Sequence, residues 1–238
     1  MRTVQTLRMR HLRGKFIVLD GPDGAGKSTH HRRLETALRD AGVAVTSCRD
    51  PGGTLIGDRV RGVLLDHDLS AMDPVCETLL FMASRAQLLA EVIRPALVRG
   101  ETVLCDRFVS STCAYQGAAG FAPTRVIELA RFVVGEPPYG WPDMTIILDV
   151  SPETGFARIG RTPKGPTRRR GVASGPALIE GCAPDAMESR PLEFHRRVRE
   201  LFLELPTWYP SPVRIVDATG DTDAVHARLL EALADVAP

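Results

Sequence analysis

The chain has 238 residues, of which 44% are hydrophobic, so it is long and apolar enough to bury a substantial core. Thirty basic and 29 acidic residues give a net charge of +1, which excludes a disordered polyelectrolyte and a protein that binds nucleic acid or membranes through a broad positive field. Five cysteines without a C-x-x-C pair predict free thiols and a cytoplasmic protein, and no apolar run is long enough for a membrane span.

The N-terminal segment, residues 1–14, carries basic residues and no acidic one. We expect a flexible basic tail here, followed by a single domain over residues 15–238.

From residue 15 onward, short apolar runs alternate with longer amphipathic segments. The runs predict strands at 16–20, 43–49, 102–106, 144–150 and 213–216, and the amphipathic segments predict helices that include 28–40, 74–98 and 221–236. This alternation predicts an α/β fold in three layers, with a five-stranded parallel sheet flanked by helices. Residues 161–184 are rich in Gly, Pro and Arg and predict a long loop that is either functional or disordered.

The strongest local motif is GPDGAGKS at 21–28, which fits G-x-x-x-x-G-K-[ST] between a predicted strand and a predicted helix. Its glycines allow backbone N–H groups to turn toward an anion, and the helix adds its positive N-terminal end. Lys27 is placed to meet β- and γ-phosphates, and Ser28 to offer its hydroxyl to Mg²⁺. The motif predicts a P-loop for ATP or GTP, formed by Gly21, Pro22, Asp23, Gly24, Ala25, Gly26, Lys27, Ser28 and Thr29.

Arginines stand at the ends of two other predicted strands. Arg49 ends the second strand, and Asp106 and Arg107 follow the third. Ligands of open α/β sheets bind at the carboxyl ends of the strands, and a guanidinium matches phosphate oxygens bidentately. The two arginines therefore predict a second phosphate site, although each alone would equally suit a surface ion pair.

Two groups of residues could bind a base. Phe81 and Arg85 are four residues apart and share a helix face, where the ring could stack on a base and the guanidinium could bond its edge. Thr112, Tyr115 and Gln116 form a second polar group. The residue types alone leave core packing and solvated helix faces as alternatives for both groups.

Taken together, these motifs resemble the thymidylate kinase family from about residue 15 to the end of the chain. The resemblance rests on an ordered set of segments: FIVLDGPDGAGKST at 16–29, RDPGGT at 49–54, LLFMASRAQ at 79–87, DRFVSSTCAYQG at 106–117, PDMTIILDVSPETG at 142–155 and RPLEFHRRVRELFLEL at 190–205. The combination of DRF with AYQG distinguishes this family from other nucleoside monophosphate kinases. Gly24 resembles the bacterial type, in which lid arginines supply transition-state charge.

The resemblance implies ATP-dependent phosphorylation of dTMP to dTDP, for dTTP synthesis, with Mg²⁺ as cofactor. It implies a homodimer, with neither a membrane nor a nucleic acid as partner. The implied site divides into an ATP side, where Arg158 joins the P-loop, and a metal position held by Ser28 and Asp106, directly or through water. Asp23 would accept the 3′-hydroxyl of the acceptor sugar.

The dTMP side is implied residue by residue. Phe81 would stack on thymine, Arg85 would bond the base edge, and Arg107 would hold the dTMP phosphate. The base and sugar would be lined by Thr112, Gln116 and Tyr115, with Tyr115 filling the space of a ribose 2′-hydroxyl. Arg49 would border the acceptor site. A methyl group in a pocket is worth only about 1–3 kcal/mol, so some turnover of dUMP is expected.

The predicted lid, at about 160–185, departs from the family pattern. Ala186 stands where the family has an arginine, and about twenty residues, 164–184, are inserted. We expect Arg161 or one of Arg168, Arg169 and Arg170 to replace the missing guanidinium; a disordered basic insertion is the alternative.

Three other functions stay open at this point. One is a kinase for another pyrimidine monophosphate or a deoxynucleoside. Another is a catalytically impaired, nucleotide-binding regulator, which the altered lid favours. The third is a local nucleic-acid contact through residues 168–170.

Overall fold

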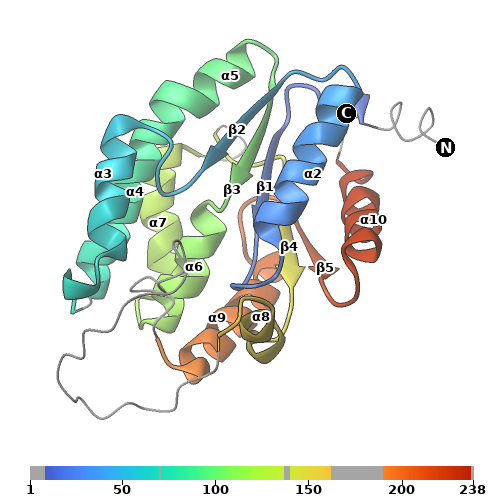
Figure 1. Cartoon of the computed structure of the whole chain (residues 1–238). Helices are drawn as coiled ribbons and strands as arrows, with labels where there is room; N and C mark the ends of the chain where they lie inside the picture. The colour runs from blue at the N-terminus through green and yellow to red at the C-terminus, as the bar shows by residue number, and fades with distance from the viewer. Residues whose placement is uncertain (1–8, 70, 137–139, 162–189, 237–238) are drawn as a thin grey trace, which may run out of the picture.

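A five-stranded parallel sheet forms the centre of the molecule in the computed structural model, which describes residues 9–69, 71–136, 140–161 and 190–236 (Figure 1). The strand order is β2-β3-β1-β4-β5. The strands are β1 (Phe16–Asp20), β2 (Val45–Arg49), β3 (Thr102–Asp106), β4 (Met144–Asp149) and β5 (Val213–Asp217). The predicted fold class is confirmed, and each predicted strand lies within two residues of its expected bounds.

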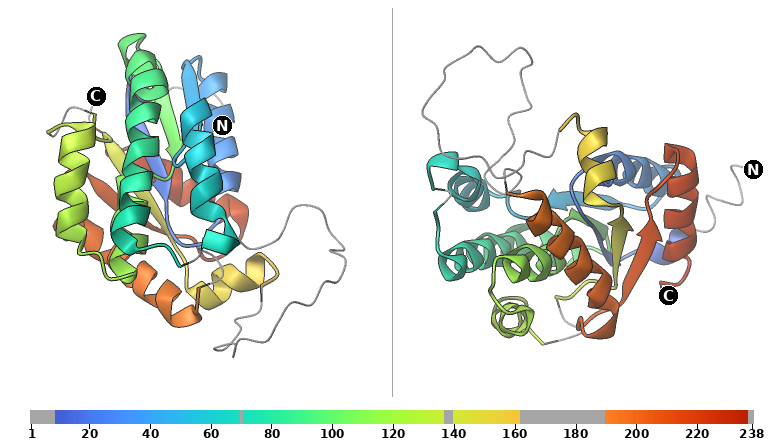
Figure 2. Two further views of the ribbon diagram at one scale, coloured as in Figure 1. Left: turned by 90° about the vertical axis from the view of Figure 1, so that its left-hand side faces the viewer. Right: turned by 90° about the horizontal axis from the view of Figure 1, so that it is seen from below.

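Helices cover both faces of this sheet, as the end-on view in Figure 2 shows. One face carries α2 (Lys27–Asp40) and α10 (Thr222–Leu233), and the other carries α4 (Pro74–Leu88), α6 (Val109–Ala118), α7 (Pro123–Val134) and α9 (Leu192–Glu204). Helix α3 (Leu55–Leu65) packs against α4. The short elements are η1 (Arg10–Leu12), η2 (His67–Leu69), η3 (Leu89–Ile93), α5 (Arg94–Val98), α8 (Pro152–Arg158) and η4 (Leu205–Thr207).

The sheet separates two hydrophobic cores. Every residue of β1 is buried, because this strand is central and both of its faces are covered by helices. Phe16 and Val18 pack toward the α4–α6 side, whereas Ile17 and Leu19 pack toward α2 and α10. The continuous apolar run at 16–19 is the sequence signature of such a strand.

The predicted helix at 74–98 is interrupted near its end. Helix α4 passes into the π-helical turn η3 and then into α5, whose second residue is Pro95. Proline lacks the N–H that would bond to the carbonyl four residues earlier, and its ring clashes with that carbonyl. A wider turn directly before Pro95 fits this constraint.

The N-terminal segment differs from the prediction. Met9 and Leu12 are buried in the core beside α10, and the Thr102 hydroxyl donates a hydrogen bond of 2.7 Å to the Leu12 carbonyl. The expectation of a flexible tail is therefore wrong for residues 9–14, because two apolar side chains anchor them. Residues 1–8 lie outside the described part. Within the described ranges, no helix is both long and apolar enough to cross a membrane.

Stacked imidazoles connect α2 with α10 and make stability depend on pH. The rings of His30 and His226 lie 5.8 Å apart at an interplanar angle of 12°. Burial, with repulsion from Arg33, lowers the pKa of His226 to about 4. The unfolded chain, with a histidine pKa of about 6.5, binds more protons between these values, so the free energy of unfolding falls as the pH drops through this window.

We expect His226→Phe, which keeps a stacked ring but cannot titrate, to lose less stability than the parent between about pH 7 and about pH 5. Urea-unfolding midpoints of both proteins at the two pH values measure the difference. Equal losses in the two proteins would contradict the assignment.

Candidate active site

A cavity of about 800 Å³ lies at the carboxyl edge of the sheet. The register aligns Leu19 of β1 and Arg49 of β2 with Asp106 of β3, so the loops after these strands start at one level. The cavity wall includes the P-loop, the segments after β2 and β3, one face of α4 and α6, and the start of α10. The predicted P-loop and the predicted base-binding residues therefore line the same cavity.

The P-loop has the backbone conformation that its glycines predict. Gly24 and Gly26 have φ values of +74° and +91°, in the left-handed region. A Cβ atom added to Gly24 would lie 2.0 Å from the carbonyl oxygen of Gly155 on α8, so close backbone packing also requires glycine there. Gly26 is the N-cap residue of α2, which directs the N-terminus of that helix at the cavity.

Lys27 is held inside this loop. Its ammonium donates hydrogen bonds to the carbonyl oxygens of Gly21 at 2.9 Å and Pro22 at 2.8 Å, and it lies 3.9 Å from Asp23. Burial, with repulsion from Arg107, lowers the pKa of Lys27 to about 8. The surroundings thus disfavour the charged form of Lys27, and a bound anion would stabilise it.

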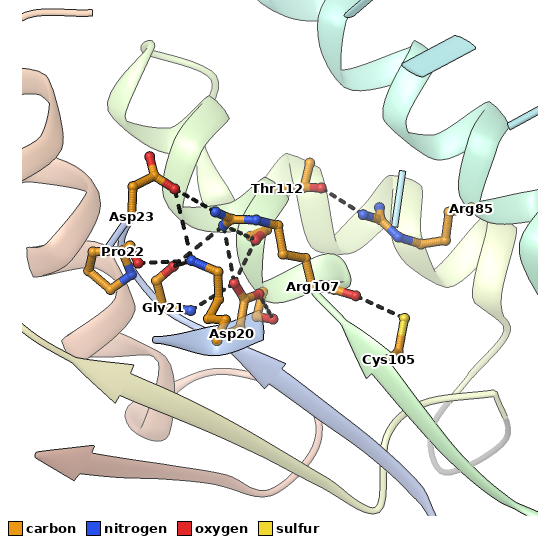
Figure 3. A network of polar contacts seen from close by, with 11 residues as sticks. Asp20, Gly21, Pro22, Asp23, Arg85, Cys105, Arg107 and Thr112 are labelled. Atoms are coloured by element: carbon orange, nitrogen blue, oxygen red, sulfur yellow. Dashed lines mark hydrogen bonds and ion pairs between the residues drawn. The ribbon is translucent and has the colours of Figure 1, made fainter. Parts of the chain in front are cut away.

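Arg107 reaches the same loop from the end of β3 (Figure 3). Its guanidinium donates to Asp23 at 2.7 Å and to Ser111 at 3.1 Å, and lies 3.4 Å from the Gly21 carbonyl. The residue has a φ of +68°, which is uncommon for a residue other than glycine and occurs mainly where surrounding contacts fix the backbone. Lys27 and Arg107 therefore share two partners, Asp23 and the Gly21 carbonyl.

Two aspartates balance these cations. Asp20 is fully buried and accepts hydrogen bonds from Ser110 at 2.6 Å and Ser111 at 2.7 Å. Burial disfavours ionisation of Asp23, but Arg107 and Lys27 outweigh it and hold the pKa of this carboxyl below its usual value. Asp23 is therefore charged at neutral pH.

The predicted base-binding residues line the other end of the cavity. Arg85 is 1% exposed, donates to Asp50 at 2.6 Å and to Thr112 at 2.9 Å, and forms the cavity wall together with Phe81. Burial raises the pKa of the Asp50 carboxyl in spite of Arg85, and its second oxygen has no hydrogen-bond partner among the described residues. Sequence reasoning missed Asp50, although its position directly after Arg49 at a strand end was a usable signal.

Tyr115 and Gln116 also line this end. The Tyr115 ring lies below the Arg107 guanidinium, 5.1 Å from its central carbon. Burial raises the pKa of Tyr115 well above its usual value, so the phenol is neutral. The contact between Tyr115 and Arg107 thus connects the predicted base-binding residues with the P-loop end of the cavity.

The P-loop end is bordered by α8, α10 and the turn after β5. Arg158 lines it from α8, with one guanidinium nitrogen 3.5 Å from the Gly220 carbonyl oxygen. Ala218 and Val225 supply apolar wall here, and His30 lies beside the P-loop. Val225 and His30 were not identified from the sequence, because an isolated apolar residue and a lone histidine carry no local signal.

A divalent cation would find few protein ligands here. The described residues contain no cluster of three or more His, Cys, Asp or Glu side chains that could hold a metal. Ser28 and Asp106 both line the cavity, and one carboxylate oxygen of Asp106 is buried without a hydrogen-bond partner in the described part. This donor set fits Mg²⁺, which commonly binds through one or two protein oxygens, substrate phosphates and water.

Several predicted residues do not come to the cavity. Arg49 is half-exposed, lies 3.8 Å from Asp58, and is not part of the wall, which contains Arg61 instead. Arg61 donates to the Pro51 carbonyl at 3.1 Å and was missed because nothing separates it from other helix arginines in the sequence. The guanidinium of Arg161 lies over the Phe156 ring at 4.5 Å, outside the wall. Arg168, Arg169, Arg170 and Ala186 lie outside the described residues.

Comparison with known proteins places this site in a family. The family model described as thymidylate kinase matches residues 19–229. Thymidylate kinase of Deinococcus radiodurans is 44% identical over 93% of this chain and 97% of its own length, and that of Nitratidesulfovibrio vulgaris is 38% identical over 93% and 96%. The crystal structure of thymidylate kinase from Ehrlichia chaffeensis superimposes with a TM-score of 0.66 at 28% identity, covering 92% of this chain and 97% of that one.

The P-loop, the Arg107 cluster and the predicted base-binding residues thus occur in a chain that matches this family along nearly its whole length, and the protein belongs to the thymidylate kinase family of nucleoside monophosphate kinases.

Proposed function

We propose that the protein transfers the γ-phosphoryl group of ATP to dTMP, which gives dTDP and ADP. The observation that carries this proposal is the meeting of Lys27 and Arg107 at Asp23 and at the Gly21 carbonyl. One cation belongs to the P-loop and the other to the strand end beside the base-binding residues. Two phosphate sites so close together suit transfer between two bound nucleotides better than binding of one.

The acceptor is held along the α4–α6 side of the cavity. Phe81 offers a ring face to the base, and Arg85, fixed by Asp50 and Thr112, offers donors to a base carbonyl. Arg107 binds the acceptor phosphate when its guanidinium exchanges Asp23 for phosphate oxygens. Asp23 is then free to accept the sugar 3′-hydroxyl, and Arg61, rather than Arg49, supplies the further positive charge at this end.

The donor phosphates lie in the P-loop, where Lys27 exchanges two carbonyl oxygens for phosphate oxygens. An acceptor phosphate oxygen attacks the γ-phosphorus in line, and the bond to the β–γ bridging oxygen breaks as ADP leaves. The acceptor phosphate needs no general base, because its second pKa is about 6. Ser28 and Asp106 would hold Mg²⁺, which would supply positive charge to the donor phosphates. Arg158, Ala218 and Val225 border the nucleoside part of ATP.

Three further features belong to the proposal. The four free cysteines of the described part, Cys48, Cys76, Cys105 and Cys113, suit the reducing cytoplasm. Long helices on one side of the sheet are available for a homodimer. Transfer to the nucleotide rather than to water requires the cavity to close over the phosphates, which is the role we assign to the lid at about 160–185.

The reaction is tested by coupled detection of ADP with dTMP, dUMP, dCMP and thymidine as acceptors. We expect strong activity with dTMP, weaker activity with dUMP and none with thymidine, which has no phosphate for Arg107.

Arg107→Lys keeps a positive charge beside Asp20 and Asp23 but loses the bidentate fork, so kcat/KM for dTMP is expected to fall on the order of 10²- to 10³-fold. Arg214→Lys, at the opposite edge of the sheet, is the matched control. Equal activity of the two variants would contradict the assignment of Arg107.

The lowered pKa of Lys27 predicts proton uptake when ATP binds. At about pH 8.5 the buried amine is largely neutral in the free protein, and the phosphates of bound ATP favour its charged form. Titration calorimetry in buffers of different ionisation enthalpy should therefore show net proton uptake at this pH, and little at about pH 6.5, where the amine is already charged. In Lys27→Met the uptake at high pH should disappear; persistence of the uptake would assign it to another group.

The source of lid charge is tested by single alanine substitutions at Arg161, Arg168, Arg169 and Arg170. If one of them replaces the arginine absent at Ala186, its alanine variant should lose on the order of 10³-fold in kcat. Losses below about threefold at all four positions would show that this chain transfers phosphate without a lid guanidinium.

A further inference from the structure

A buried carboxylate at the base end of the cavity has no part in the chemistry described so far. Glu77 lies on α4, one turn before Phe81, and is only 4% exposed. One of its carboxylate oxygens accepts a hydrogen bond from the Gln116 side-chain nitrogen at 3.1 Å, and the other accepts one from Arg190 at 2.8 Å. Buried acidic residues are rare unless both oxygens are satisfied, as they are here.

These contacts determine the orientation of the Gln116 amide. An ionised carboxylate can only accept hydrogen bonds, so the –NH₂ group of Gln116 must face Glu77 and the amide oxygen must point the other way. That oxygen is buried and has no hydrogen-bond partner among the described residues, and Gln116 lines the cavity. The side chain is therefore fixed as an acceptor toward a ligand.

Arg190 fixes Glu77 in turn. Its guanidinium lies 4.7 Å from the centre of the Phe194 ring on α9, and its ion pair with Glu77 is largely shielded from solvent. The hydrogen-bonded series Arg190–Glu77–Gln116 thus connects the segment just before α9 with α4 and α6, behind the end of the cavity proposed to bind the base. A polar chain of this kind holds each side chain in one orientation.

We propose that Glu77 is a positioning residue that determines which pyrimidine the site accepts. With Gln116 fixed as an acceptor and Arg85 able only to donate, the wall matches a base that carries an N–H at N3 and a carbonyl at C4. Thymine and uracil have both groups, whereas cytosine has an acceptor at N3 and an amino group at C4. This inference rests on the proposed function and specifies how the base is selected.

The substitution Glu77→Gln should reverse the orientation of the Gln116 amide. The new amide oxygen keeps the bond to Arg190, so the new –NH₂ group faces Gln116 and makes it turn its own –NH₂ group toward the base. We expect the ratio of kcat/KM for dTMP to that for dCMP to fall by at least about tenfold, mainly through KM, because the Gln116 amide now offers a donor to N3, which suits cytosine and not thymine. Loss of structural support alone would lower kcat/KM for both substrates and leave this ratio unchanged.

A second substitution should restore the selectivity. In Glu77→Gln/Gln116→Glu, the carboxylate at position 116 accepts from the amide at 77 and again presents an acceptor oxygen to the base. We expect the dTMP-to-dCMP ratio to return to within about threefold of the parent value. Glu91→Gln, an exposed change on the following turn η3, is the matched control and should leave the ratio unchanged.

A chemical probe tests the same point in the unaltered protein, which removes any question of folding. N3-methyl-dTMP carries a methyl group in place of the N3 hydrogen, so it has no donor for Gln116. Its binding, followed by titration calorimetry, should be at least about 10²-fold weaker than that of dTMP. Equal binding of the two, or an unchanged dTMP-to-dCMP ratio in a folded Glu77→Gln variant that phosphorylates dTMP, would overturn the inference while the proposed function stands. If the unaltered protein binds dTMP more tightly than dCMP but forms no dTDP, the proposed function is overturned and the inference on base selection stands.

Discussion

The structure depends on a carboxylate, Asp23, that lies between two cations. Lys27, at the start of α2, and Arg107, directly after β3, carry like charges and are largely buried, so their approach would be unfavourable without a counter-charge. Asp23 contacts both, and Asp20 with its two serine donors supports Arg107 from below. This arrangement keeps the two cations that we propose to bind phosphates close together in the absence of nucleotide.

The same arrangement explains why these groups are ready to exchange partners. Lys27 is bonded to neutral carbonyl oxygens, and burial has lowered its pKa, so phosphate oxygens offer it a better environment. Arg107 is bonded to a carboxylate that it can replace by another anion. In the proposed reaction, binding of both nucleotides would replace the contacts inside this ion cluster by contacts with substrate, and little of the protein need move.

The sequence was sufficient for the parts of the molecule that depend on local patterns. The buried run at 16–19, the glycines of the P-loop and the arginine after β3 each follow from short-range constraints, and the structure places them as expected. Other parts depend on contacts between distant segments. The path of the chain after β2 decides that Arg61, and not Arg49, lines the cavity. The N-terminal segment is buried because Met9 and Leu12 reach the core beside α10. Asp50 acquires its partner because Arg85 lies opposite. No spacing rule contains this information.

A common pattern joins the two ends of the cavity. At both ends a carboxylate contacts the side chain that would meet the nucleotide. Asp23 contacts Arg107 at one end, and Asp50 contacts Arg85 and Glu77 contacts Gln116 at the other. Phosphate recognition needs charge, and an exchangeable carboxylate such as Asp23 suits it. Base recognition needs a fixed direction of donors and acceptors, and for this the supporting carboxylates must stay in place when ligand binds. The depth at which Asp50 and Glu77 are buried, with Glu77 paired on both oxygens, meets that requirement. This supports the proposal that residues which do not touch the base determine its selection.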